Sequence, residues 1–112
     1  MTHKYHAVKT VVDGVSFDSK REANRYRELL LLKRAGVVKD VQLQPEYELM
    51  PGFTHHASGK RIRPTKYIAD FLITYADGHQ EIEDTKGVRT EAYNLKKKMF
   101  MHRYPDLQIK EV

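Results

Sequence analysis

Asp70 is the residue of this chain whose type and position point most directly to chemistry. It interrupts an apolar segment, Tyr67–Tyr75, and shares one strand face with Ile68 and Leu72. A buried carboxylate is costly unless it meets a cation, a metal ion or the open end of a strand. Taken alone, Asp70 also fits a structural role in which it accepts backbone hydrogen bonds at a bulge.

The triplet Asp84-Thr85-Lys86 supplies the second group of chemical residues. Asp84 and Lys86 lie two positions apart, so in a strand their side chains leave the same face. Two carboxylates with a few water ligands suit Mg²⁺, and a lysine beside them can orient or deprotonate a water and stabilise charge on phosphorus. The simpler alternative for Asp84 and Lys86 is an ion pair at a strand end.

An Asp-Gly turn signal between the two segments makes them antiparallel neighbours. A turn of two residues sets Ala76 opposite His79 and Asp70 opposite Thr85, whereas a slip of one residue sets Asp70 beside Asp84. In both registers the two carboxylates lie within one or two residues across the ladder. Such a pair repels unless a divalent cation joins it, so the hairpin favours a metal site.

The elements that position these residues begin with a hairpin and a helix. Residues 7–17 are rich in β-branched residues and contain Asp13-Gly14, which predicts a two-residue turn. A helix is expected at 19–35, because Ser19 and Glu22 have capping-box spacing. Its apolar positions are Ala23, Tyr26, Leu29, Leu30 and Leu32.

The rest of the chain predicts more strands, one loop and a second helix. An extended segment is expected at 37–50, interrupted by Pro45, and a loop at 51–65. Strands at 66–75 and 80–86 are joined by Asp77-Gly78. A helix follows at 91–102, with Ala92, Leu95 and Met99 on its inner face, and then a strand at 107–112. This order predicts a mixed α/β fold (α+β mixed sheet), with a central mixed sheet flanked by helices. We expect a single domain over residues 1–112, its core spanning about 7–112.

Composition bounds the class of protein. The chain has 112 residues, 40% of them apolar and 31% charged, which is typical of one folded globular domain. No run of apolar residues is long enough to span a membrane, and no secretory signal opens the chain. The absence of cysteine excludes disulfides and thiolate metal sites and favours a reducing compartment, so we expect the protein in the cytoplasm.

The charge balance favours an anionic partner. There are 20 Lys and Arg residues against 15 Asp and Glu, which gives a net charge of +5. Basic side chains on both sides of the hairpin suit contacts to DNA phosphates, which position a duplex without reading its sequence. The alternative is an ordinary solvated surface. The candidate DNA-binding residues are Lys60, Arg61, Arg63, Lys66, Arg89, Lys96 and Lys97.

Three motifs together resemble a known nuclease superfamily. They are Phe17-x-Ser19-x-x-Glu22, Tyr67-x-Ala69-Asp70-Phe71 and Glu83-Asp84-x-Lys86-Gly87. The pattern resembles the PD-(D/E)xK nuclease superfamily over residues 17–103, and most closely a group of short phage-type proteins thought to be endonucleases related to Holliday-junction resolvases and to nuclease subunits of some transposons. Ala69 departs from the proline that gives the superfamily its name, at a position that varies among its members.

The resemblance implies a restriction-endonuclease-like domain and a site. Asp70, Asp84 and Glu22 would bind Mg²⁺, for which Mn²⁺ can substitute, and Lys86 would assist the nucleophile. Glu22 has an alternative role as the partner of Ser19 in the capping box. The resemblance further implies a phage or bacterial protein of DNA recombination that cuts branched DNA such as a Holliday junction, and hence a homodimer, because two symmetric cuts need a two-fold axis.

Two rival functions remain open from the sequence. One is a nuclease of the same chemistry that acts on flap, mismatch or transposon-end DNA. The other is a non-catalytic DNA-binding module. Asp70 and Asp84 weigh against the second, because carboxylates repel phosphate unless a metal ion lies between them.

Overall fold

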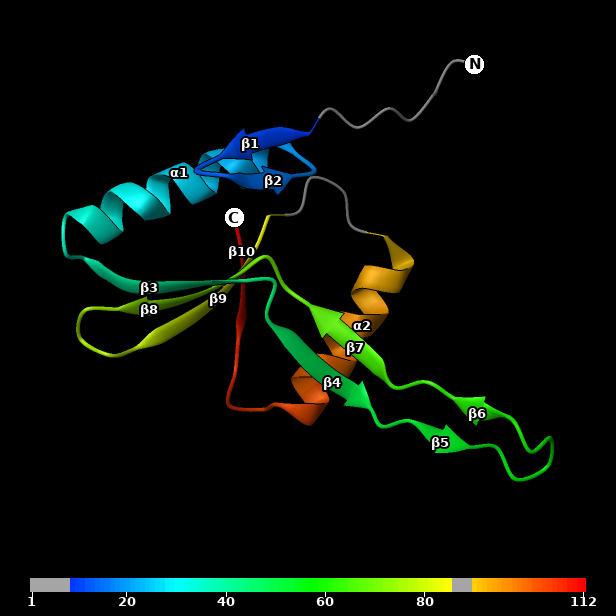
Figure 1. Cartoon of the computed structure of the whole chain (residues 1–112). Coiled ribbons are helices and arrows are strands. Elements are labelled where there is room, and N and C mark those ends of the chain that lie inside the picture. Colours follow the sequence, from blue (N-terminus) through cyan, green and yellow to red (C-terminus); the bar gives the residue numbers. More distant parts are fainter. Residues whose placement is uncertain (1–8, 86–89) are drawn as a thin grey trace, which may run out of the picture. The chain divides into compact units, whose positions relative to one another are not determined.

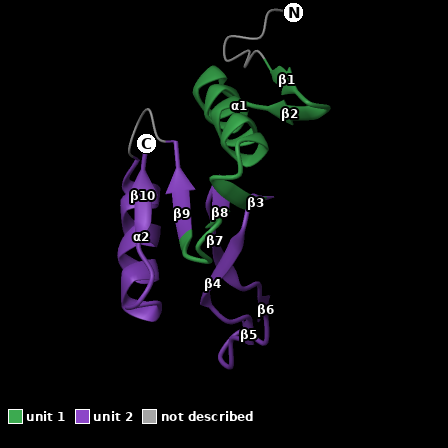
Figure 2. Ribbon diagram, turned by 90° about the vertical axis from the view of Figure 1, so that its left-hand side faces the viewer, with its two compact units in different colours: residues 1–41, 73–80 green, residues 42–72, 81–112 purple. Residues whose placement is uncertain are grey.

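The computed structural model describes residues 9–85 and 90–112 of the chain (Figure 1). Its described part is a mixed α+β structure with two helices and a four-stranded mixed sheet, which confirms the predicted fold class. The sheet order is β10 (Ile109–Glu111), β9 (Gln80–Asp84), β8 (Phe71–Tyr75) and β3 (Val38–Leu43). The chain divides into two compact units, coloured in Figure 2: Met1–Val41 with Ile73–Gln80, and Gln42–Leu72 with Glu81–Val112.

The first unit opens with the hairpin of β1 (Thr10–Val12) and β2 (Val15–Phe17). Val12 pairs with Val15, so the turn between them holds only two residues. These are Asp13 with φ 49° and Gly14 with φ 78°. Positive φ at both positions is the requirement of a type I′ turn, and the predicted hairpin is confirmed.

Helix α1 (Lys20–Arg34) follows and packs on this hairpin. Ser19 is its N-cap, and the Ser19 hydroxyl accepts a hydrogen bond from the backbone N–H of Glu22 at 3.1 Å. This bond satisfies one of the free N–H groups of the first turn. The helix buries Ala23, Tyr26 and Leu29, as the apolar spacing predicted, and the Tyr26 ring lies 5.1 Å from that of Phe17.

The extended segment predicted at 37–50 forms two strands. β3 ends at Leu43, and β4 (Glu46–Met50) begins after Pro45, which lies outside both. Gln44, with φ 50°, turns the chain between them. Proline has no N–H for a ladder, which is the reason that Pro45 interrupts the strand.

The strand predicted at 66–75 is wrong as a continuous element. β7 (Thr65–Ile68) pairs antiparallel with β4 in a two-stranded ribbon, whereas β8 belongs to the four-stranded sheet. Asp70 lies in the break between β7 and β8. Ile68 is half exposed, so it shares no buried face with Asp70.

The segment 51–65 was expected to be a loop, and this expectation is also wrong. It contains β5 (Phe53–Thr54) and β6 (Arg61–Ile62), which pair antiparallel, and β7 begins at Thr65. The backbone of a protruding segment is thereby paired within itself.

Helix α2 (Glu91–Arg103) starts at the N-cap Thr90, whose hydroxyl accepts from the N–H of Tyr93 at 3.1 Å. The helix forms where predicted, but its predicted inner face is only partly right. Met99 is partly buried and packs against the core, whereas Ala92 and Leu95 are exposed and the helix buries Tyr93 and Phe100. The two aromatic rings remove more apolar area from water than the smaller residues would, and they decide the orientation of the helix.

The core of the second unit gathers around α2, β4 and β7. Its buried residues are Leu49, Tyr67, Ala69, Ile82, Tyr93, Phe100 and Ile109. Phe100 is at its centre, 5.3 Å from the ring of Tyr47 and 5.5 Å from that of Tyr67. In the described part of the chain, neither helix has the length and apolar character needed to traverse a lipid bilayer.

Candidate active site

Asp70 is bound closely to the end of β9. One oxygen of its carboxylate, Oδ2, accepts two hydrogen bonds from Thr85, from the backbone N–H and from the hydroxyl, each at 2.7 Å. The backbone N–H of Asp70 donates to the Glu83 carbonyl at 3.1 Å, and its own carbonyl accepts from the N–H of Gln44 at 2.9 Å. Asp70 is therefore hydrogen-bonded to both chain neighbours of Asp84, namely Glu83 and Thr85.

The turn that leads into β9 explains this register. Tyr75 N–H donates to the His79 carbonyl at 2.9 Å, so the loop is the three residues Ala76–Gly78. Of the two registers that the sequence left open, the two-residue turn with Ala76 opposite His79 is wrong, and the slip of one residue is the one that forms. Only Gly78 of the Asp77-Gly78 pair has positive φ, 94°, which is typical of a three-residue hairpin loop and not of a type I′ turn.

Asp84 is the last residue of β9, and its side chain is fully buried. The Tyr67 hydroxyl donates a hydrogen bond to Asp84 Oδ2. The phenol thus fixes the orientation of a carboxylate that has lost contact with water. Asp70 and Asp84 are adjacent at the backbone, while their carboxylates have different hydrogen-bond donors, Thr85 and Tyr67.

Glu111 is a functional candidate that the sequence analysis did not identify. β10 runs parallel to β9, and Glu111 is the register partner of Asp84. Its carboxylate accepts from the Tyr93 hydroxyl at 2.7 Å and lies 3.3 Å from the Lys97 ammonium. The available signal was the spacing of Tyr93 and Lys97 by one helical turn, together with a glutamate at the end of a strand.

The tyrosines at this site experience the field of the carboxylates. Burial raises the pKa of Tyr67 far above its ordinary range, and the hydrogen bond to Asp84 raises it further. Burial also raises the pKa of Tyr93, as do its hydrogen bond to Glu111 and the charge of Asp84. Both phenols are therefore held protonated, as hydrogen-bond donors to carboxylates.

The other predicted catalytic residues are placed less fully. Lys86 and Gly87 lie outside the described residues, as does Arg89 among the predicted DNA-binding residues. Glu22 is half-buried on α1 in the first unit, and its N–H is bound by Ser19. The capping contact from Ser19 is confirmed, and a metal-binding role for Glu22 stays a prediction.

The predicted DNA-binding residues of the second unit differ in their surroundings. Lys60, Arg61 and Arg63 are exposed on and beside the β5–β6 ribbon, and Lys96 is exposed on α2. Lys66 is held by Glu46 at 3.0 Å, and Lys97 is half-buried against Glu111. Ion pairing lowers the net charge that Lys66 and Lys97 offer to a phosphate.

The donor set agrees with a hard divalent cation. Among residues 9–85 and 90–112, no three His, Asp or Glu side chains form a metal-binding group. Mg²⁺, however, commonly takes only one or two protein carboxylates and completes its shell with water and substrate phosphate. Asp70 and Asp84 supply oxygen donors of that kind, so the residues present fit the ion.

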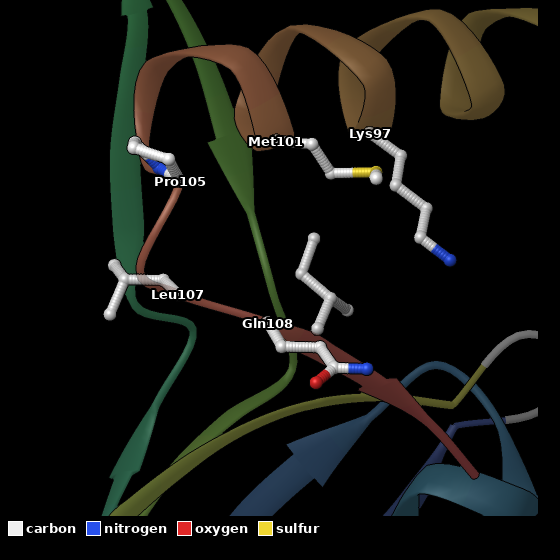
Figure 3. Close-up of a pocket in the computed structure, with 6 residues that line it drawn as sticks. Lys97, Met101, Pro105, Leu107 and Gln108 are labelled. Atoms are coloured by element: carbon white, nitrogen blue, oxygen red, sulfur yellow. The ribbon is translucent and has the colours of Figure 1, made fainter.

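A separate pocket of about 420 Å³ lies beside Lys97, between α2 and the segment that leads into β10 (Figure 3). Lys97 and Met101 line it from the helix. Its remaining lining is Pro105, Leu107, Gln108 and Ile109. This lining contains no carboxylate, so the pocket is not the candidate metal site.

The sequence was also compared with known proteins. Residues 2–112 match the family described as protein of unknown function (DUF1064). The chain belongs to this family. No curated protein and no solved structure matches it. The function of this DUF1064 protein is therefore inferred from its own residues and geometry.

Proposed function

We propose that this DUF1064 protein is a metal-dependent endonuclease that hydrolyses phosphodiester bonds in DNA. The observation that carries the proposal is the attachment of the Asp70 carboxylate to Thr85, whose peptide N–H directly follows Asp84. Asp70, from the break between β7 and β8, and Asp84, the last residue of β9, are thereby held at one point of the backbone. Lys86 is the next residue of the chain.

Each residue of the site has a distinct role in this proposal. Asp70 and Asp84 would hold Mg²⁺, or Mn²⁺ in its place. When bound, the ion supplies Lewis-acid polarisation of a phosphoryl oxygen and lowers the pKa of a water molecule. Lys86 would orient the attacking water or take up its proton, and would offset negative charge that develops on phosphorus.

The surrounding hydrogen bonds preorganise the carboxylates. Thr85 holds Asp70 with two donors, and Tyr67 holds Asp84 with its hydroxyl. A metal site works best when its ligands are fixed by such outer contacts, because then no reorganisation is needed during the reaction. Burial of Asp84 also lowers the local dielectric and strengthens its attraction to a cation.

Branched DNA is the proposed substrate. The candidate DNA-binding residues are lysines and arginines that suit phosphates, and phosphate contacts read no sequence, so recognition by the shape of a distorted duplex is favoured. Two symmetric cuts in a four-way junction would require two copies of the site related by a two-fold axis, so the active species is proposed to be a homodimer.

The decisive experiment measures cleavage of a labelled four-way junction with Mg²⁺ or with EDTA. We expect wild-type cleavage only with Mg²⁺, and a loss of about 100-fold or more in Asp70→Asn, Asp84→Asn and Lys86→Ala, as when a transition-state contact is removed. In the two Asp→Asn variants, asparagine keeps an oxygen that can accept the hydrogen bonds of Thr85 or Tyr67. These two variants therefore test the negative charge of the carboxylate and not the stability of the fold. Asp106→Asn, at an exposed acidic residue, is the matched control and should cleave normally.

The substrate and the chemistry are tested separately by the same panel. Linear, nicked and flap duplexes run beside the junction show whether branching is preferred, and equal cleavage of all four would contradict the substrate proposal. Metal-independent cleavage, or full activity in Asp84→Asn, would contradict the mechanism. DNA binding without cleavage under all these conditions would favour a non-catalytic module.

A further inference from the structure

The β5–β6 hairpin and its flanks, residues 51–64, form an arm that the proposed chemistry does not use. Its pairing is regular: Phe53 is opposite Ile62 and Thr54 is opposite Arg61. The tip is closed by hydrogen bonds from His55 N–H to the Lys60 carbonyl and from Gly59 N–H to the His55 carbonyl, both 2.7 Å. The arm is therefore an ordered two-stranded ribbon.

The arm adds nothing to the core of its own unit. Within the described part of that unit, β5 and β6 contact each other and no other helix or strand, and Figure 1 shows them beyond the ends of β4 and β7. Every described residue of the arm except Gly52 and Ile62 is exposed. A ribbon that buries no core surface is explained better by an external partner than by folding.

The charge of the arm is of one sign. Lys60, Arg61 and Arg63 are its cations, and no acidic residue occurs between Pro51 and Ala69. No ion pair in the described part of the chain involves any of these three side chains. In the same unit Arg103 lies 3.2 Å from Glu48 and Lys66 lies 3.0 Å from Glu46, so these two cations are paired with carboxylates while those of the arm are not.

Two arginines lie close together in the chain at the end of this ribbon. Arg61 is the first residue of β6, and Arg63 follows the last residue of that strand; both side chains are exposed. Gly52 leaves room beside Arg61, because a side chain there would meet a guanidinium nitrogen of Arg61 at 3.0 Å. The arm thus presents two adjacent planar donors that suit phosphate oxygens.

We propose that the arm is a docking ribbon for duplex DNA, with Arg61 and Arg63 against the phosphate backbone. A two-stranded β-ribbon fits the major groove of B-form DNA, and arginine contacts to phosphate fix the orientation of a bound protein. The choice of duplex DNA as the partner of the arm rests on the proposed nuclease function. Binding of the duplex to the arm can nevertheless be measured without cleavage.

The test compares two triple variants with equal loss of charge. In the arm variant Lys60, Arg61 and Arg63 are replaced by glutamine; in the control variant Lys33, Arg34 and Lys39, exposed residues outside the arm, are replaced likewise. Fluorescence anisotropy with a labelled duplex and a labelled four-way junction, in EDTA over a salt series, gives the dissociation constants. We expect the arm variant to bind roughly 10- to 100-fold more weakly and its salt slope to fall by about 2 to 3, as expected for the loss of three phosphate contacts.

The control variant should lose no more than about two-fold, and both variants should keep the wild-type circular dichroism and thermal unfolding midpoint, because surface substitutions away from packed features have small effects. Wild-type affinity in the arm variant, or equal weakening in the control, would overturn the proposal. So would arm-dependent binding to phosphatidylserine vesicles without binding to duplex. Arm-dependent DNA binding with no cleavage in Mg²⁺ would support the arm and contradict only the nuclease proposal.

Discussion

At the scale of single residues, the environment of Asp84 sets the character of the candidate site. The Tyr67 hydroxyl donates to Asp84, and Glu111 is the register partner of Asp84 on the next strand. Tyr93 in turn donates to Glu111. Each of these two carboxylates therefore has a protonated phenol as a donor, and loss of either phenolic proton would place a third negative charge among them.

This arrangement predicts how stability depends on pH. Burial raises the pKa of Tyr67 and of Tyr93 above the ordinary value of 10.0. Below pH 10.0 both phenols are therefore protonated in the folded and in the unfolded chain, and their contribution to the free energy of unfolding is fully present. Above it the unfolded phenols lose protons while the folded ones keep them, so the free energy of unfolding should fall by about 1.4 kcal/mol per pH unit for each tyrosine. Urea unfolding at pH values on both sides of 10.0 measures the slope.

Tyr67→Phe isolates one of these phenols. The variant should be about 1 to 3 kcal/mol less stable near neutral pH, because the buried Asp84 loses a donor. Above pH 10.0 its stability should fall less steeply than that of the wild type. A slope equal to the wild-type slope would contradict the assignment.

At the scale of elements, α2 shows how packing decides which face of a helix is buried. The apolar pattern pointed to Leu95, which is 57% exposed, whereas Phe100 is fully buried. Phe100→Ala should therefore cost about 3 to 5 kcal/mol in the free energy of unfolding, and Leu95→Ala less than about 0.5 kcal/mol. Chemical denaturation of both variants measures the difference, and comparable losses would place the helix in a different orientation.

The break between β7 and β8 is the second instance at this scale. Ala69 N–H donates to the Pro45 carbonyl at 3.1 Å, and Asp70 N–H donates to Glu83. The backbone thus changes partners from the β4 side to β9 over two residues. This change of partners brings the Asp70 side chain to Thr85.

At the scale of the whole molecule, the proposed metal should act as a stabilising ligand. An ion that binds only the folded chain adds about 1.4 kcal/mol at ten times its dissociation constant. Mg²⁺ should therefore raise the thermal unfolding midpoint of the wild type and of Asp106→Asn, but not that of Asp84→Asn. Scanning calorimetry with and without Mg²⁺ tests this without any substrate, and an equal shift in Asp84→Asn would exclude Asp84 as a ligand.

The elements that depend on local interactions could be predicted from the amino-acid sequence. Ser19 and Asp13-Gly14 predicted the helix start and the first hairpin correctly, because a cap and a type I′ turn are satisfied within a few residues. The Asp77-Gly78 turn signal also predicted that Asp70 and Asp84 lie near each other, because both registers that it allowed bring the two residues within one or two positions.

Features that depend on partners far away in the sequence could not be predicted in this way. The division of the segment around Asp70 depends on pairing with Pro45 and Glu83, and the burial of Phe100 depends on rings from other strands. Glu111 joined the candidate site because a parallel strand set it beside Asp84. No local pattern specifies such a pairing, since its free energy comes from contacts between segments that are far apart in the sequence and meet only when the chain folds.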